Sequence, residues 1–166
     1  MKMTSAEAGK LLKSMQDELN NMLLIEGQSK DFESSVGEDL ESNRPEYDFA
    51  ACQKELAEKE EKIRLLKHAI NKFNVSTKVP GFDMTIDQML IYIPQLSAKK
   101  SKLEMMRSRL PKSRAPYSGS NIITYEYANY DIKEAEAEYQ RVSALLTKAQ
   151  LALDNVNSSK LINIEL

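Results

Sequence analysis

The stretch that decides the fold is Ile132–Val156, IKEAEAEYQRVSALLTKAQLALDNV, in which an apolar or aromatic side chain recurs every three or four residues. The recurring positions are Ile132, Ala135, Tyr139, Val142, Leu146, Ala149, Leu153 and Val156. Steps of three and four place these side chains on one face of an α-helix, and this repeat is typical of helices that pack against other helices. With Asn129 or Asp131 as the N-cap and Asn157 as the stop, we predict a helix over residues 131–156.

The same spacing predicts three earlier helices, over residues 6–26, over residues 45–74 with Pro45 in the first turn, and from Thr85 onward. The third begins with a capping box, Thr85 to Gln88, contains Pro94, and is closed by Pro111 and Pro116. Residues 28–44 are rich in serine and predict a long, mobile loop.

Two short segments alternate with period two and predict strands near residues 122–127 and 161–166. We expect the second to pair with the segment around Tyr125 or with another subunit, because an unpaired apolar edge invites association. The prediction is an all-α fold: one domain, residues 1–166, built as an antiparallel bundle of about four long helices with coiled-coil-like packing and these short β segments.

Composition excludes several classes of protein. The chain has 166 residues, 23 basic and 25 acidic side chains, and one cysteine, Cys52. Its longest uninterrupted apolar run, residues 89–93, falls far short of the ~20 residues that span a bilayer, and we expect no export signal. A lone thiol suits a reducing compartment, so the expected location is the cytoplasm.

No catalytic residue, metal ligand or cofactor is predicted. Cys52 and His68 are sixteen residues apart on one helix, which puts them about 160° apart around its axis and argues against a shared mechanism. Leu65, not a glutamate, lies three residues before His68, so the Glu-x-x-His pair of di-metal bundles is missing. Glycine-rich phosphate-binding loops are also missing. We therefore expect no enzymatic activity.

Charge is segregated along the chain. Residues 98–114 hold seven basic side chains and one acidic side chain, whereas residues 26–61 hold twelve acidic and four basic ones. These regions could attract each other within one bundle or between subunits. The basic stretch, with tyrosines nearby, is also a candidate for contact with nucleic acid or another anion. The candidate contact residues are Lys99, Lys100, Lys102, Arg107, Arg109, Lys112, Arg114 and Tyr117.

Three short motifs resemble a family of small bacterial helical proteins, some of them labelled septicolysin. They are Ile70-Asn71-Lys72-Phe73-Asn74, Thr85-Ile86-Asp87-Gln88-Met89-Leu90 and Leu153-Asp154-Asn155-Val156-Asn157. The resemblance covers residues 50–166 and departs from the family pattern at Pro94 and Ser158. It implies a bacterial helical protein and brings no catalytic residue with it. The label hints at membrane lysis, which is the reading we favour least.

Taken together, the sequence predicts a non-enzymatic, cytoplasmic protein that acts through protein association, as a homo-oligomer. This prediction rests on the long apolar seams, the segregated charge and the apolar final segment. Two alternatives stay open: a nucleic-acid-binding protein that uses the basic stretch 99–114, and an enzyme whose site the sequence does not reveal.

Overall fold

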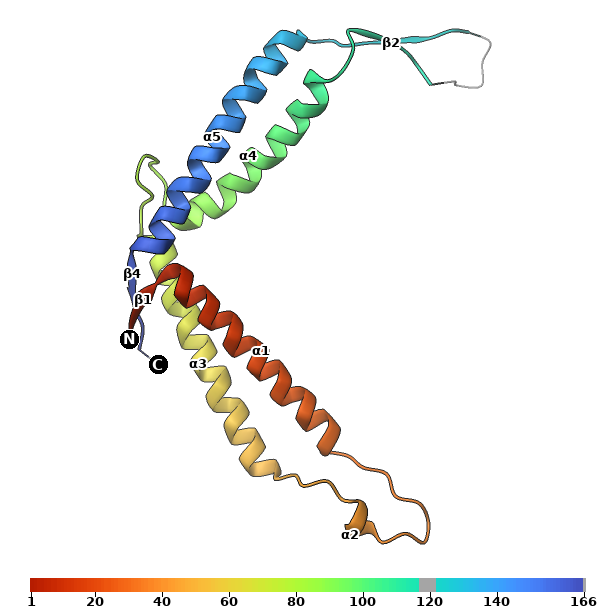
Figure 1. Cartoon of the computed structure of the whole chain (residues 1–166), viewed down its shortest axis with the longest axis vertical. Coiled ribbons are helices and arrows are strands. Elements are labelled where there is room, and N and C mark those ends of the chain that lie inside the picture. The colour runs from red at the N-terminus through yellow and green to blue at the C-terminus, as the bar shows by residue number, and fades with distance from the viewer. Residues whose placement is uncertain (117–121, 166) are drawn as a thin grey trace. The chain divides into compact units, whose positions relative to one another are not determined.

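The computed structural model describes residues 1–116 and 122–165, and its contacts divide the chain into two compact units (Figure 1). Unit 1 comprises Met1–Ser76 with Val156–Leu166, and unit 2 comprises Thr77–Asn155. The fold is mainly helical with a few short antiparallel strands, as the sequence predicted.

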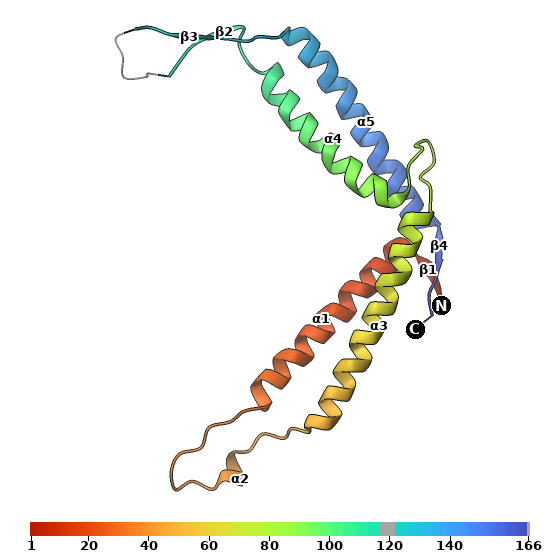
Figure 2. The same cartoon turned by 180° about the vertical axis from the view of Figure 1, so that it is seen from behind.

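Unit 1 is a helical hairpin with a two-stranded sheet at its base. Its elements are β1 (Lys2–Thr4), α1 (Ser5–Ser29), α2 (Leu40–Asn43), α3 (Phe49–Ser76) and β4 (Leu161–Asn163). Helices α1 and α3 lie side by side, as Figures 1 and 2 show from opposite sides. Helix α1 begins where Thr4 and Glu7 form a reciprocal capping box.

The core of unit 1 lies where the sheet covers the paired helices. Its buried residues are Ala8, Met15, Leu66, Ile162 and Ile164. Strands β1 and β4 are antiparallel, with Met3 opposite Ile162. Alternate side chains of β4 therefore point toward the helices, and the two ends of the described chain close one core.

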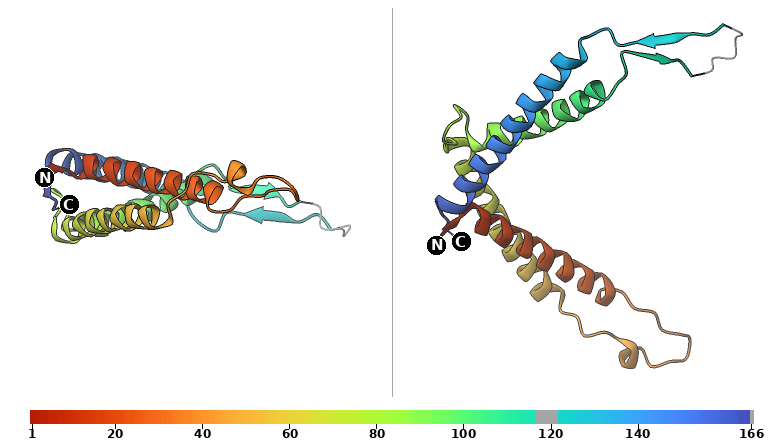
Figure 3. Two further views of the ribbon diagram at one scale, coloured as in Figure 1. Left: turned by 90° about the horizontal axis from the view of Figure 1, so that it is seen from below. Right: turned by 45° about the horizontal axis from the view of Figure 1, so that its top comes forward.

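Unit 2 is a second helical hairpin, made of α4 (Ile86–Arg107) and most of α5 (Ile132–Ser159), with β2 (Lys112–Arg114) and β3 (Tyr125–Tyr127) between them. Strands β2 and β3 pair antiparallel and extend beyond the ends of the two helices (Figures 1 and 3). The buried seam consists of Ile86, Met89, Leu96 and Leu103 of α4 and Ala135, Val142, Leu146, Ala149 and Leu153 of α5. All nine lie on the apolar repeats seen in the sequence or at its predicted capping box.

Pro94 lies inside α4, and the helix continues through it to Arg107. Its side chain is exposed on the surface away from the seam. The predicted capping box is confirmed, because the Thr85 hydroxyl accepts a hydrogen bond from the Gln88 N–H and the Gln88 side chain accepts one from the Thr85 N–H.

Two local predictions were wrong, and a third needs an addition. Pro45 does not open the second long helix, which begins at Phe49 because the Asp48 side chain accepts a hydrogen bond from the Ala51 N–H and acts as the cap. The region predicted as loop contains the short helix α2. The final strand pairs with β1, and not with the segment around Tyr125, whose partner is β2.

The first prediction tests the single-layer core of unit 1. Leu66→Ala should lower the free energy of unfolding by about 2–5 kcal/mol, because Leu66 is 0% exposed and its loss leaves a cavity. The matched control is Leu65→Ala, one residue earlier and 42% exposed, which should cost about 1 kcal/mol or less. Urea titration of both full-length variants measures the difference. Equal losses would contradict the assigned core.

Candidate functional site

Arg107 lies at the centre of the polar contacts between α4 and α5. Its guanidinium forms ion pairs with Glu104 at 2.8 Å and with Glu136 at 3.0 Å, and lies 4.0 Å from the centre of the Tyr139 ring. The hydrogen bonds that Arg107 donates to both carboxylates raise its pKa above the ordinary value. Arg107 therefore links α4 to α5 through its ion pair with Glu136.

Most other candidates in the basic stretch also have partners inside unit 2. Lys99 pairs with Glu138 at 2.6 Å, and Arg109 pairs with Glu126 of β3 at 2.6 Å. The Lys112 ammonium lies 4.1 Å from the centre of the Tyr125 ring and 5.5 Å from that of Tyr127, and Lys100 lies over the ring of Tyr139.

Of the remaining candidates, Lys102 and Arg114 are exposed and form no ion pair within residues 1–116 and 122–165. Tyr117 lies outside the described residues. The sequence suggested that the basic stretch and the acidic region 26–61 could attract each other. Carboxylates of α4, α5 and β3 pair with Lys99, Arg107 and Arg109, and the other four cations of the stretch form no ion pair within residues 1–116 and 122–165.

Glu138 is the most strongly perturbed carboxylate of unit 2. Hydrogen bonds from Arg141 and Lys99 lower its pKa from the ordinary 4.5 to about 2. Arg141 makes two of these bonds, at 2.6 and 2.7 Å, in a forked arrangement. Because its pKa is about 2, the Glu138 carboxyl is ionised near neutral pH. It therefore forms ion pairs with Lys99 and Arg141 and does not act as a proton donor.

Cys52 and His68 are separated along α3, as predicted. Cys52 lines a hollow of about 320 Å³ together with Glu26 and Tyr47, whereas His68 lines a different hollow. The Tyr47 hydroxyl donates a hydrogen bond to Glu26 at 2.9 Å. Burial, and then the Glu26 carboxylate, raise the pKa of the Cys52 thiol, which disfavours the nucleophilic thiolate.

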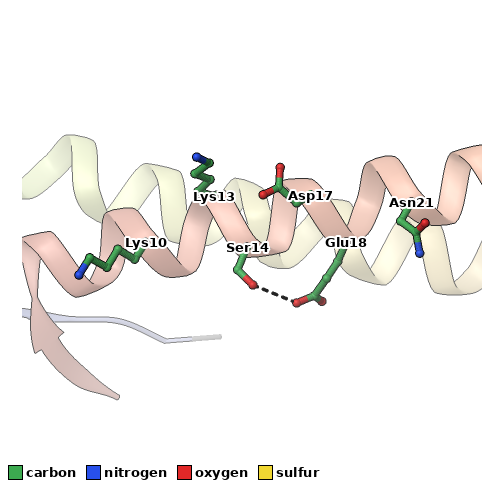
Figure 4. Close-up of a pocket in the computed structure, with 6 residues that line it drawn as sticks. All are labelled: Lys10, Lys13, Ser14, Asp17, Glu18 and Asn21. Carbon is green, nitrogen blue, oxygen red and sulfur yellow. Dashed lines mark hydrogen bonds between the residues drawn. The ribbon is translucent and has the colours of Figure 1, made fainter.

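A further hollow, of about 500 Å³, lies on the flank of α1 (Figure 4). Lys10, Lys13, Ser14, Asp17, Glu18 and Asn21 line it, and all six come from this one helix. Figure 4 shows their side chains splayed along the helix rather than converging, with one hydrogen bond from Ser14 to Glu18. Such an open surface offers no enclosed position for a substrate.

The sequence reasoning missed a second apolar repeat on each helix of unit 2. Ile91, Ala98 and Met105 each lie two residues after a buried residue of α4, and Ala137, Ala144 and Leu151 each lie two residues after a buried residue of α5. Two residues correspond to about 200° around a helix, so these side chains lie on the far side from the buried seam. The signal was available as the seven-residue spacing of each set.

Uncharged residues fill the gaps in these repeats, and we call the two exposed sets the outer seams. The α4 outer seam is Ile91, Pro94, Ala98, Ser101 and Met105, and the α5 outer seam is Ala137, Gln140, Ala144, Thr147 and Leu151. Both follow the alternating three and four spacing of helix-packing positions. The exposed fraction is 59% for Ile91, 71% for Met105 and 65% for Leu151.

The hydroxyl groups within the outer seams already have hydrogen-bond acceptors. Ser101 donates to the Ser97 carbonyl at 3.1 Å, and Thr147 donates to the Ser143 carbonyl at 3.1 Å. The Gln140 side chain donates to Glu136. A partner could therefore cover these residues without leaving those donors unpaired, which is the main cost of burying polar groups.

Unit 1 has no comparable outer seams on its two long helices. The residues two positions after its buried helical residues are Lys10, Asp17, Glu58 and His68, three of them charged. Charged outer faces favour contact with water over contact with another helix. The uncharged outer faces are thus specific to unit 2.

The described residues contain neither a metal-binding cluster nor a membrane-spanning helix. Within residues 1–116 and 122–165, no three His, Cys, Asp or Glu side chains come together in a way that could hold a metal ion. Among the same residues, no helix combines the length and apolarity needed to cross a bilayer.

Comparison with known proteins identifies a fold and no function. No family model matches the chain, and no curated protein matches it. The chain is similar in structure to a conserved protein of unknown function from Corynebacterium diphtheriae, with a TM-score of 0.62 and 21% identity over 98% of this chain and 100% of that one. This likeness shows the fold alone, and none of these comparisons supports the resemblance to proteins labelled septicolysin.

The second prediction concerns Glu138. A carboxylate whose pKa is lowered on folding stabilises the fold above its unfolded pKa, and this contribution is lost as pH falls from about 4.5 toward about 2. Glu138→Gln should therefore lose less stability than the wild type when pH falls through that window. Urea midpoints at pH 5 and pH 2.5 measure the loss, with Glu134→Gln, exposed at the start of α5, as control. An unchanged pH dependence in Glu138→Gln would contradict the assignment.

The third prediction concerns Cys52. Its raised pKa should make alkylation by iodoacetamide at pH 8 several times slower than that of a free cysteine. Glu26→Gln should speed the reaction and shift its pH–rate profile to lower pH, because a negative neighbour is removed. Glu58→Gln, also on α3 but outside this hollow, is the control. A profile that Glu26→Gln leaves in place would refute the electrostatic explanation.

Proposed function

We propose that this is a non-enzymatic protein that acts through protein association, and that it assembles with further copies of itself. The observation that carries the proposal is the pair of outer seams of unit 2, which expose uncharged side chains at helix-packing positions on both long helices. Exposed apolar surface of this kind on a soluble domain marks interaction sites.

The shape of each outer seam favours a helix as its partner. Positions that alternate by three and four form a stripe about one helix wide, and the small side chains of Ala98, Ser101 and Ala144 allow close approach of a second helix. Association of two copies would give each stripe a helical surface of the same kind. The satisfied hydroxyls of Ser101 and Thr147 remove one cost of that burial.

We propose no reaction because the polar groups that lie close together form ion pairs and hydrogen bonds with one another. Lys99 pairs with Glu138 and Arg107 pairs with Glu136 across the α4–α5 hairpin, and the raised pKa of the Cys52 thiol disfavours it as a nucleophile. We place the protein in the bacterial cytoplasm, where the reducing environment would keep the lone Cys52 thiol free. The bacterial source of the structural neighbour is consistent with this placement.

The fourth prediction tests the outer seams directly. Wild-type protein should show a mass above that of one chain in sedimentation equilibrium at micromolar concentrations. Ala98→Glu and Ala144→Glu should each raise the dissociation constant about tenfold or more, because each buries an unpaired carboxylate in the interface.

Two substitutions provide matched controls for this experiment. Gln95→Glu on α4 and Gln150→Glu on α5 add the same charge at exposed positions outside the outer seams, and should leave the dissociation constant nearly unchanged. A wild-type protein that stays monomeric across the concentration range would refute self-association. Equal effects of seam and control variants would show that the outer seams are not the contact.

A further inference from the structure

Strand β4 has one edge that no other strand covers within the described residues. The sheet contains two strands, β1 and β4, with Lys2 opposite Asn163. The Met1 nitrogen donates to the Ile164 carbonyl at 2.7 Å, and the Ile164 N–H donates to the Met1 carbonyl at 2.8 Å. In antiparallel sheets such bonded pairs alternate with unbonded ones, so the backbone groups of Asn163 point away from β1.

The same alternation turns the backbone groups of Leu161 and Glu165 outward. We call the outward backbone groups of Leu161, Asn163 and Glu165 the β4 edge. Side chains alternate independently: Ile162 and Ile164 are 4% and 1% exposed and face the helices, whereas Leu161 is 60% exposed. The β4 edge therefore presents donors and acceptors at every second residue, which is the pattern that an added strand needs.

A groove of about 480 Å³ lies beside this edge. Its walls are β4 and α3, and α3 contributes apolar surface through Leu65, Ala69 and Phe73. Leu65 is 42% exposed. In a second copy Ile162 and Ile164 are buried in that copy's own core, so the groove marks the open side of the β4 edge and these side chains do not fill it.

The outer edge of β1 is protected, but the β4 edge is not. On β1, Lys2 carries a charge and the Thr4 N–H is donated to the Glu7 carboxylate at 2.8 Å. On β4, the strand Leu161–Asn163 contains neither a charge nor a proline, and the charge of the β4 edge, on Glu165, lies at its end. Charge and capped backbone groups prevent edge pairing, so Lys2 and the capped N–H of Thr4 on β1 leave β4 as the pairing edge.

We propose that the β4 edge pairs with β4 of a second copy of this chain, antiparallel about a twofold axis at Asn163, to form a four-stranded sheet in the order β1-β4-β4-β1. The outward positions 161, 163 and 165 are symmetric about Asn163, so each edge is complementary to itself in this register. Antiparallel pairing also brings the Lys160 end of one strand near the Glu165 end of the other, whereas parallel pairing would align like charges.

This inference rests on the proposed function only in that copies of the chain associate, and it names an interface separate from the outer seams. The direct test is disulfide trapping in a Cys52→Ser background. In the proposed register Asn163 faces its own symmetry mate as a hydrogen-bonded pair, with Cα atoms about 5.5 Å apart, within the range of a disulfide. Oxidised glutathione should therefore convert Asn163→Cys into a covalent dimer, as two thiols each lose a proton and together give up two electrons to it.

The matched control is Lys2→Cys, which lies directly opposite Asn163 in the same sheet but on β1. It should stay monomeric under the same conditions on non-reducing gels. A mixture of Leu161→Cys and Glu165→Cys proteins should cross-link with each other, because these positions face each other in the register. Cross-linking of Lys2→Cys as fast as Asn163→Cys would overturn the proposal.

Association without cross-links is measured by sedimentation equilibrium. Asn163→Pro removes an outward N–H that β1 does not use and should raise the dissociation constant about tenfold or more, whereas Lys2→Pro should not. Leu161→Glu and Leu161→Lys serve where proline disturbs folding: the first places a like charge opposite Glu165 of the second copy, the second an opposite charge. Leu161→Glu should bind about tenfold more weakly than Leu161→Lys.

The outcomes separate this inference from the proposed function. If the wild type associates but Asn163→Pro matches Lys2→Pro and Asn163→Cys does not cross-link, the β4 pairing is overturned and association through the outer seams stands. A wild type that is monomeric at every concentration overturns both. Loss of association in Asn163→Pro and in Leu161→Glu, but not in the control variants Lys2→Pro and Leu161→Lys, supports the β4 pairing.

Discussion

Two paired helices can bury only the stripe that each turns toward the other, and this constraint governs both units of the protein. Each hairpin has a core one side chain thick, formed by residues such as Leu66 in unit 1 and Met89 in unit 2. The rest of each helix is surface. A fold of this kind has little interior in which ionisable groups could be enclosed, and in the described residues the buried side chains are apolar. The polar chemistry of the molecule is therefore confined to surface ion pairs and hydrogen bonds.

The two hairpins meet this constraint in different ways. Unit 1 adds a third layer from its own chain, because β1 and β4 place Ile162 and Ile164 over α1 and α3. Its outer helical faces carry charges such as Lys10, Asp17 and Glu58. Unit 2 pairs its helices through Arg107 and Lys99, and its outer faces are uncharged. The outer helical faces of unit 1 thus suit contact with water, whereas those of unit 2 suit packing against another helix.

The sequence contained the information for the buried seams and the capping box because both depend on neighbours within one helix. The spacing of Val142, Leu146 and Ala149 and the Thr85–Gln88 pair were enough to place α5 and the start of α4. The partner of the final strand depends on contact between residues about 160 positions apart, which no local pattern encodes. Strand β2 was missed for a related reason: Lys-Ser-Arg has no apolar alternation and is held by its pairing with β3.

The candidate surfaces were harder to predict than the fold because exposure is not a property of sequence spacing. A stripe such as Ala137, Ala144 and Leu151 has the same spacing as the buried seam, and only the structure decides which of the two stripes faces the other helix. Likewise, the sequence did not show that Glu126, Glu136 and Glu138 pair with Arg109, Arg107 and Lys99 of the basic stretch. In unit 2, charged side chains such as Lys99 and Arg107 form ion pairs between α4 and α5, and the outer seams are uncharged. Charged residues are what normally favour contact between an outer helix face and water. Because an isolated pair of helices gains little from its single buried layer, covering those outer faces with another helix would add the second layer that unit 1 obtains from β1 and β4.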